Sequence, residues 1–176
     1  MRNLFSKIRG FLLKSTCPLF FRGIGKNLHL YGRLRLPLIY SNIWFGNDCS
    51  IGESVFFQSG RKSIISIGNN CSFNTGCHIV SAEKISIGNN VAIAEYVSIR
   101  DQEHKFNPLF GVRNQGFSTK AVYIGSNVWI GRGVYIGPGT EIGSGSIIGA
   151  NSVVRGAFPD NVLIAGTPAK IKKYLR

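Results

Sequence analysis

The chain has 176 residues, of which 44% are hydrophobic and 22 are glycine, and it carries 21 Lys and Arg against eight Asp and Glu. This length predicts a single domain, and the net charge of +13 predicts an anionic partner. Nucleic acid is excluded as that partner, because the chain has no helix-turn-helix pattern, zinc-finger spacing or RNP-like aromatic strand. Anionic small molecules and membrane headgroups remain as candidate partners.

A basic amphipathic segment is the first expected element and covers residues 1–26. Residues 1–40 hold eight Lys or Arg and no acid. Five apolar residues near the start share one helical face: Leu4, Phe5, Ile8, Phe11 and Leu12. The apolar run is too short to span a bilayer and lacks a secretory cleavage site, so a cytoplasmic location is expected. Two interpretations stay open. The helix packs on the end of the main domain or on a neighbouring subunit, or it lies peripherally on the anionic inner face of the cell membrane.

A six-residue hydrophobic repeat organises residues 27–167. A fixed period of six predicts a parallel β-solenoid built from hexapeptides, in which each coil contacts only its neighbours. The stretch from Asn27 to Ser41 is expected to form a degenerate first coil with Leu28, Leu30, Leu34 and Leu36. Downstream, inward-facing guide residues recur in triplets: Phe45, Ile51, Phe57; Ile67, Phe73, Ile79; Ile87, Ile93, Ile99; Ile124, Ile130, Ile136; and Ile142, Ile148, Val154.

Three interruptions of the repeat all fall after the third hexapeptide of a coil. The steps that begin at Phe57, Ile79 and Ile99 are ten, eight and 25 residues long. They are therefore expected at one corner of a triangular prism. The last of them predicts a protruding loop over residues 100–121, which is too long and too polar for a core connection and is expected to be functional.

Small or β-branched side chains stand four residues after a guide residue at eleven positions, from Cys49 to Ser152, and predict tight corners there. The glycine beside a guide residue is expected to let the chain bend. Cys49, Cys71 and Cys77 occupy the small-residue position. They are expected to be reduced, buried fillers, with Cys49 and Cys71 on the same face of adjacent coils. Nothing else in the sequence indicates a disulfide framework.

The repeats occur together with the loop Ile99-Arg-Asp-Gln-Glu-His104 and with two local runs, Ile124-Gly-Ser-Asn-Val-Trp129-Ile-Gly131 and Ile164-Ala-Gly166-Thr-Pro168-Ala-Lys170. This combination resembles the hexapeptide-repeat acetyltransferases, in the branch of galactoside, maltose and polysaccharide O-acetyltransferases. The resemblance implies an all-β fold, a left-handed parallel β-helix of about five to six triangular coils. It also implies short N-terminal and C-terminal helical segments, the latter in a tail over residues 168–176, and a homotrimer whose acetyl-CoA sites lie between subunits.

The resemblance also implies site residues. His104 matches the catalytic histidine, a side chain suited to act as a base near neutral pH. Asn74 matches an asparagine that contacts the acceptor hydroxyl and the reaction centre, and Asp101 and Gln115 are expected beside the acceptor. The cofactor contacts that the resemblance implies are Trp129 at the pantetheine arm, Ala150 through its backbone, and Lys170 and Lys173 near the nucleotide phosphates. Arg132 and Arg155 depart from the family pattern and are also expected at the cofactor, with Arg155 supplying a cation. A packing role is the alternative for Trp129. Ala82 replaces an acid used for sugar contact, which leaves the acceptor open.

These residues favour an acetyl-CoA-dependent O-acetyltransferase that modifies a sugar hydroxyl in bacterial surface polysaccharide, on a sugar or a lipid-linked saccharide. No metal is expected, because His29, His78 and His104 do not have the pattern of a three-histidine zinc site. Two alternatives stay open. One is N-acetylation of an amino-sugar nucleotide, in which a free amine needs no base, and the other is a non-catalytic solenoid scaffold.

Overall fold

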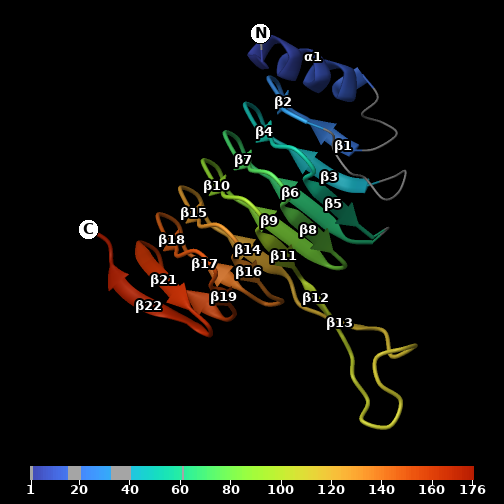
Figure 1. Ribbon diagram of the computed structural model, residues 1–176, viewed down its shortest axis with the longest axis vertical. Coiled ribbons are helices and arrows are strands. Elements are labelled where there is room, and N and C mark those ends of the chain that lie inside the picture. Colours follow the sequence, from blue (N-terminus) through green and yellow to red (C-terminus); the bar gives the residue numbers. More distant parts are fainter. Residues whose placement is uncertain (1, 16–20, 33–40, 61) are drawn as a thin grey trace.

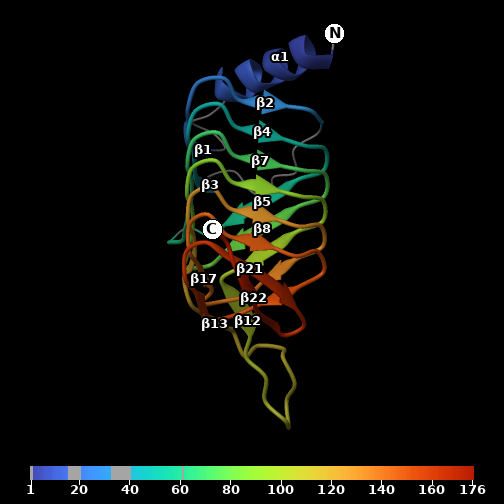
Figure 2. The ribbon, with the colours of Figure 1, turned by 90° about the vertical axis from the view of Figure 1, so that its left-hand side faces the viewer.

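The computed structural model describes residues 2–15, 21–32, 41–60 and 62–176. They form a parallel β-solenoid of about six turns (Figure 1), with one short N-terminal helix. The described strands of the solenoid form three sheets of seven, eight and five strands. We call these sheets the first, second and third faces of a triangular prism. Figure 2 looks onto the second face, where β2, β4 and β7 follow one another along the prism axis.

The strands visit the faces in turn. The first face holds β1 (Phe21–Ile24), β3 (Ser41–Phe45), β6 (Ile64–Ile67), β9 (Lys84–Ile87), β14 (Val122–Ile124), β17 (Glu141–Ile142) and β20 (Ala157–Phe158). The second holds β2 (His29–Leu30), β4 (Ser50–Ile51), β7 (Ser72–Phe73), β10 (Ala92–Ile93), β15 (Trp129–Ile130), β18 (Ile147–Ile148), β21 (Val162–Gly166) and β22 (Ala169–Tyr174). The third holds β5 (Phe56–Ser59), β8 (His78–Ser81), β11 (Ser98–Arg100), β16 (Tyr135–Ile136) and β19 (Val153–Val154).

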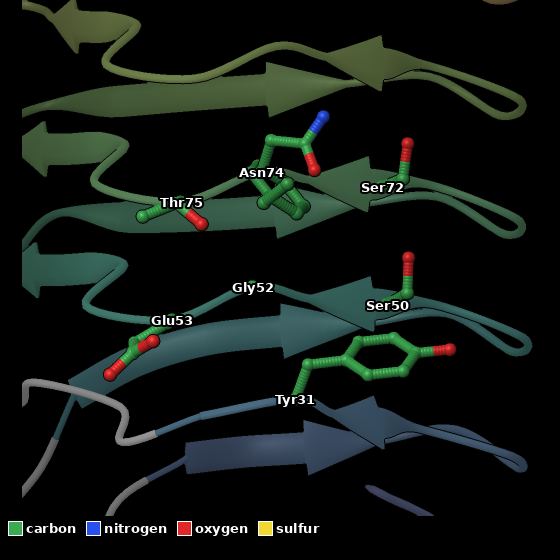
Figure 3. A pocket seen from close by; sticks show the side chains of 8 residues that line it. Tyr31, Ser50, Gly52, Glu53, Ser72, Asn74 and Thr75 are labelled. Carbon is green, nitrogen blue, oxygen red and sulfur yellow. The ribbon is translucent and has the colours of Figure 1, made fainter. Parts of the chain in front are cut away.

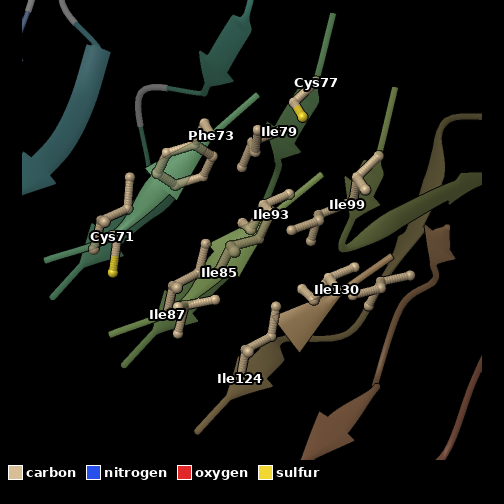
Figure 4. Close-up of a cluster of buried hydrophobic side chains, with 14 of the residues drawn as sticks. Cys71, Phe73, Cys77, Ile79, Ile85, Ile87, Ile93, Ile99, Ile124 and Ile130 are labelled. Carbon is tan, nitrogen blue, oxygen red and sulfur yellow. The ribbon is translucent and has the colours of Figure 1, made fainter. Parts of the chain in front are cut away.

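The predicted hexapeptide register is confirmed. On the first face Phe45 pairs with Ile67 and Ile67 with Ile87, and the same ladder continues to Ile124 and Ile142. Equivalent ladders join the guide residues of the second and third faces. Every guide residue is at most 5% exposed, and together their side chains fill the prism (Figure 4). Because water is excluded from this stack, apolar side chains are favoured at each guide position.

The small-residue position is also confirmed as an inward one, because each of the eleven small or β-branched side chains there is at most 1% exposed. Cys49, Cys71 and Cys77 are buried free thiols. Cys49 donates to the Gly68 carbonyl oxygen at 3.2 Å, and Cys71 donates to that of Gly88 at 3.1 Å. The thiols therefore fill the corners and satisfy neighbouring backbone oxygens.

The glycine beside each guide residue does not make the bend, contrary to expectation. Positive φ occurs three residues after the guide, as at Asn70 (54°) and Asn90 (56°), where asparagine tolerates the left-handed region. The adjacent glycine is required for a different reason, the short distance to the next coil. A Cβ on Gly68 would lie 2.6 Å from the carbonyl oxygen of Gly88 in the next coil. Glycine is needed there because neighbouring coils approach each other closely at the corner.

A ladder of side-chain oxygens joins the coils at the corner between the first and second faces. The backbone N–H of Asn47 donates to Oδ1 of Asn69, and the N–H of Asn69 donates to Oδ1 of Asn89. The N–H of Asn89 donates to the hydroxyl of Ser126. Each coil thus satisfies a corner N–H of the preceding coil that sheet pairing leaves unpaired.

Both ends of the prism are covered. Helix α1 (Arg2–Ser15) lies across the N-terminal end and packs mainly against β2 (Figures 1 and 2). Strand β1 already pairs with β3, so the first face begins upstream of Asn27. Leu28 and Leu30 are buried as expected of a first coil, whereas Leu34 and Leu36 lie outside the described residues.

The expected C-terminal helical segment is wrong, because the tail forms strand β22. This strand pairs antiparallel with β21. The physical reason is that the second face would otherwise end on a row of unpaired N–H and C=O groups. Ile171 also packs against the core from β22. Pairing along this edge satisfies more backbone groups than one turn of helix in so short a tail.

Candidate active site

A β-hairpin carries His104 away from the prism. Strand β11 on the third face leads into β12 (Gln102–His104), which pairs antiparallel with β13 (Phe117–Thr119). His104 is opposite Phe117, and their ring centroids are 4.3 Å apart. Beyond the paired strands the loop projects past the coils (Figure 1). The long interruption of the repeat is therefore a protruding hairpin that places an exposed imidazole beside an aromatic ring.

The imidazole borders a hollow of about 440 Å³ between the hairpin and the third face. Residues from four strands of that face and from the hairpin line it: Gln58, Val80, Arg100, Gln102, Glu103, His104, Phe117 and Tyr135. The hollow combines a base, a carboxylate, a guanidinium and an aromatic wall. A group with this composition can orient a polar substrate and move a proton.

The base of the hairpin is held to the coils by Glu103. Its carboxylate forms an ion pair with Arg155, which follows β19, and lies 3.5 Å from the Tyr135 hydroxyl. The guanidinium of Arg155 also lies over the Tyr135 ring, 5.6 Å from its centroid. The hydrogen bonds that Arg155 donates to Glu103 raise the pKa of Arg155. Partial burial, followed by the charge of Glu103, raises the pKa of Tyr135. We call Glu103, Tyr135 and Arg155 the hairpin clamp.

The clamp was not anticipated. Arg155 was expected to contact the cofactor, whereas its guanidinium is paired with Glu103. A signal was nevertheless present in the sequence. Tyr135 directly precedes the guide residue Ile136 and Arg155 directly follows the guide residue Val154, so both lie at the outer surface of the third face near the loop corner.

Asp101 is corrected from an acceptor contact to a structural residue. It is fully buried, and its carboxylate accepts hydrogen bonds from the Ser81 hydroxyl and from the N–H groups of Ala82 and Glu83. Its own carbonyl oxygen accepts from the N–H of Lys120, at the return of the loop. Asp101 thus anchors the hairpin to the corner of the preceding coil and presents no surface to a substrate.

Asn74 lies at another corner of the prism. It is exposed just after β7 and borders a hollow of about 380 Å³ whose lining includes Tyr31, Glu53, Ser72 and Thr75 (Figure 3). This hollow and the one at His104 have no lining residue in common. Asn74 follows the second face, whereas His104 follows the third. The fold of the chain does not bring the two expected catalytic residues together.

The remaining expected cofactor residues lie on the second face and at its corner with the third. Trp129 points outward from β15 and is 57% exposed. Arg132 lies over the Tyr96 ring, 5.6 Å from its centroid, and Ala150 is exposed in the adjoining coil. Lys170 and Lys173 are exposed on β22, at the far edge of the same face. Gln115 is apart from all of these, half-buried within the loop.

His78 is exposed at the start of β8, as expected of an outward position, and its ring centroid lies 5.3 Å from that of Phe56. His29 is bonded near α1, where the Ser6 hydroxyl lies 3.3 Å from its Nδ1. Within the part of the chain that the structure describes, no three His, Cys, Asp or Glu side chains gather in a group that could hold a metal ion.

Comparison with known proteins shows the class to which this triangular hexapeptide solenoid belongs, a class of transferases. A family model described as bacterial transferase hexapeptide (six repeats) matches residues 121–156. WbbJ of Escherichia coli K12, provisionally described as a lipopolysaccharide biosynthesis O-acetyl transferase, is 37% identical over 153 residues, which cover 80% of this chain and 78% of WbbJ. The chain belongs to the hexapeptide-repeat, left-handed β-helix acetyltransferase family, and it is an acyltransferase.

Solved structures show the same fold. The polysialic acid O-acetyltransferase OatWY is 28% identical with a TM-score of 0.71, over 86% of this chain and 72% of that one. A galactoside acetyltransferase in complex with coenzyme A is 25% identical with a TM-score of 0.57, over 98% and 82%. The N-acyltransferase AntD from Bacillus cereus, solved with dTDP and 3-hydroxybutyryl-CoA, reaches a TM-score of 0.79 at 20% identity, over 95% and 88%. At that identity the likeness to AntD concerns the fold alone.

Proposed function

We propose that this protein is an acetyl-CoA-dependent O-acetyltransferase that modifies a sugar hydroxyl in bacterial surface polysaccharide. The observation that carries the proposal is the exposed His104 imidazole at the rim of a polar hollow, in a chain 37% identical to WbbJ. A hydroxyl is a poor nucleophile until a base takes its proton, whereas a free amine is already nucleophilic. A positioned histidine therefore favours a hydroxyl acceptor. Because acetyl-CoA is made in the cytoplasm, the proposal also implies a cytoplasmic enzyme.

In the proposed reaction His104 accepts the proton of the acceptor hydroxyl as its oxygen attacks the thioester carbonyl. A carbon–oxygen bond forms, the carbon–sulfur bond breaks, and His104 returns the proton to the departing sulfur. The Asn74 amide donates a hydrogen bond to the negative charge that develops on the carbonyl oxygen. The clamp holds the hairpin so that the imidazole keeps its place in the hollow. No covalent acyl-enzyme is needed.

The residues of the second face suit the acyl donor. Trp129 offers an exposed flat ring against which a pantetheine arm can lie. Arg132, Lys170 and Lys173 are exposed cations along the same face and its corner, and cations of this kind bind phosphate groups. Acetyl-CoA supplies the acetyl group and a thiol leaving group. Ala150 has no side chain beyond Cβ and leaves its backbone accessible at the corner.

We further propose a homotrimer in which each site is completed by two subunits. Two observations support this proposal. His104 and Asn74 border separate hollows within one protomer, so a neighbour is needed to supply the second residue. The hairpin also exposes apolar side chains, which a neighbouring subunit would cover. These side chains, 46% to 84% exposed, are Phe106, Leu109, Phe110, Val112 and Phe117.

The test is acetyl transfer by purified protein. Thiol release from acetyl-CoA is followed with a panel of sugars, lipid-linked saccharides and amino-sugar nucleotides, and the product is identified as an ester or an amide by its lability to alkali. We expect an ester, and His104→Ala should lower turnover by about 10²- to 10⁴-fold. His78→Ala is the matched control, an exposed histidine in the same protein that should keep its turnover.

Equal turnover in the two histidine variants would remove His104 from the mechanism. Formation of an amide on an amino-sugar nucleotide would move the protein to N-acylation. Failure to transfer to any acceptor, together with failure to bind acetyl-CoA in calorimetry, would leave a scaffold and refute the proposal. Sedimentation of a monomer would separately refute the shared site.

A further inference from the structure

Helix α1 packs on the prism through its small side chains. Ser6 and Gly10 are buried, and Leu13 packs against the core. A Cβ at Gly10 would collide with the Leu28 carbonyl oxygen, so only glycine lets the helix approach β2 this closely. The Ser6 hydroxyl lies 3.3 Å from Nδ1 of His29. Ser6, Gly10 and Leu13 therefore form the side of the helix that contacts the prism.

The opposite side of α1 is apolar and exposed. At about 100° per residue, five apolar residues point away from Ser6, Gly10 and Leu13. Their exposed fractions run from 46% to 70%, for Leu4, Phe5, Ile8, Phe11 and Leu12. The apolar face predicted from the sequence exists, but the prism does not cover it. A contiguous apolar surface of this kind marks an interaction site; we call it the α1 outer face.

Cations border the α1 outer face on both flanks. Lys7 lies on one flank and Arg9 on the other, and the Arg9 guanidinium donates to the Tyr31 carbonyl oxygen at 3.4 Å while the residue remains exposed. Lys7 and Lys26 line a hollow of about 310 Å³ next to Phe11. No acid occurs within residues 1–40, against eight Lys or Arg. An apolar strip with a cation on each side matches the boundary between acyl chains and anionic headgroups.

We propose that the α1 outer face docks the enzyme on an anionic membrane surface, with Phe11 and its apolar neighbours among the acyl chains. A lipid phosphate then fits between Lys7 and Lys26. The helix has 14 residues, about 21 Å at 1.5 Å per residue, which is shorter than a hydrocarbon core of about 30 Å. No helix among the described residues is long and apolar enough to cross a membrane. The helix therefore lies along the surface.

Charge favours a membrane over another copy of this chain as the occupant. The whole chain has a net charge of +13 and only eight acids, so a second copy offers little negative surface to meet Lys7, Arg9 and Lys26. Anionic lipid headgroups offer a dense negative surface. In a cyclic trimer three copies of α1 would lie at one height along the axis, and simultaneous contact would strengthen binding.

The test is co-sedimentation of the full-length protein with vesicles of phosphatidylcholine, with and without phosphatidylglycerol, and with no acyl donor present. We expect binding to the anionic vesicles at low ionic strength and release as salt shortens the Debye length to about 3 Å at 1 M. Lys7→Glu with Arg9→Glu should reduce partitioning by about tenfold or more. The charge-matched control, Lys62→Glu with Arg113→Glu, changes exposed cations away from α1 and should keep binding.

The apolar contribution is tested by Leu4→Ser with Phe11→Ser, which should weaken binding without changing the sedimentation coefficient of the free protein. Tyr174→Ser, which removes a large side chain that is 66% exposed on β22, is its control and should keep binding. The proposal is overturned if the wild-type protein ignores anionic vesicles at low salt, or if both charge variants bind equally. A change of oligomeric state in the Leu4 and Phe11 variant would show that a neighbouring subunit covers the face. Because no arm measures acyl transfer, these outcomes are separate from those of the proposed function.

Discussion

Replacement of Ile142 tests the solenoid core at a single position. The side chain is 3% exposed and lies in register between Ile124 and Phe158. Ile142→Ala removes three buried carbons, about 2.4 kcal/mol at ~0.8 kcal/mol each, and the cavity left behind brings the expected loss to about 3–4 kcal/mol. Ile142→Asp adds an unpaired buried carboxylate, which costs several kcal/mol more. Against a typical stability of about 5–15 kcal/mol, the Asp variant should not fold.

The assay is urea unfolding followed by circular dichroism, with the free energy extrapolated to water. Glu141→Ala is the matched control, because Glu141 precedes Ile142 in the same strand and is exposed. It should change the free energy of unfolding by less than about 0.5 kcal/mol. A soluble Ile142→Asp variant with the wild-type transition, or equal losses in Ile142→Ala and Glu141→Ala, would refute the inward assignment of Ile142.

Three further outcomes are expected. Glu103→Gln should change the free energy of unfolding by less than about 1 kcal/mol, because both partners of its ion pair are nearly half exposed. It should nevertheless lower turnover roughly tenfold or more, because the hairpin that carries His104 is held less firmly. Unchanged turnover would show that the clamp does not position the base. Burial raises the pKa of Cys77 from 9.0 to about 11, so the native state keeps a proton that the unfolded chain loses, and the stabilisation present below pH 9 is lost as pH rises towards 11. The stability advantage of the wild type over Cys77→Ala should therefore shrink by roughly 2 kcal/mol across that range, and a constant difference would contradict the raised pKa. Gly68→Ala should lower the free energy of unfolding by about 1–3 kcal/mol, because its Cβ would lie 2.6 Å from the Gly88 carbonyl oxygen. Gly60→Ala, whose nearest contact would be at 3.5 Å, is the control and should keep the wild-type stability. Equal stability of the two variants would show that neighbouring coils can move apart without a loss of stability.

Some features that recur at every coil were still misread from the sequence. The glycine that follows many of the guide residues was assigned to the bend, although the left-handed residue lies two positions further on and is often asparagine, as at Asn70. A glycine that makes the bend and a glycine that allows two coils to approach closely would both lie at the corner. Only the distance to the next coil distinguishes these two roles. The tail was expected to be helical, and the sequence of so short a segment does not show that an unpaired sheet edge lies beside it. Its pairing with β21 depends on where the last coil ends.

The sequence by itself determined the fold, because a buried guide residue returns every six residues within each coil, which is the period of a parallel β-solenoid. It also determined the location of the long loop and of His104 within it. Only the tertiary structure decided which surface residues meet. Glu103 and Arg155 are 52 positions apart and pair because the loop folds back over the third face, while Asn74 and His104 are separated by the turn of the prism. The exposed side of α1 was decided in the same way, since Gly10 and Ser6 fit the end of the prism more closely than the apolar face does. The six-residue period determines which side chains face inward and which face outward. It does not determine which outward side chains meet, because those contacts depend on how the coils stack and where the loop folds.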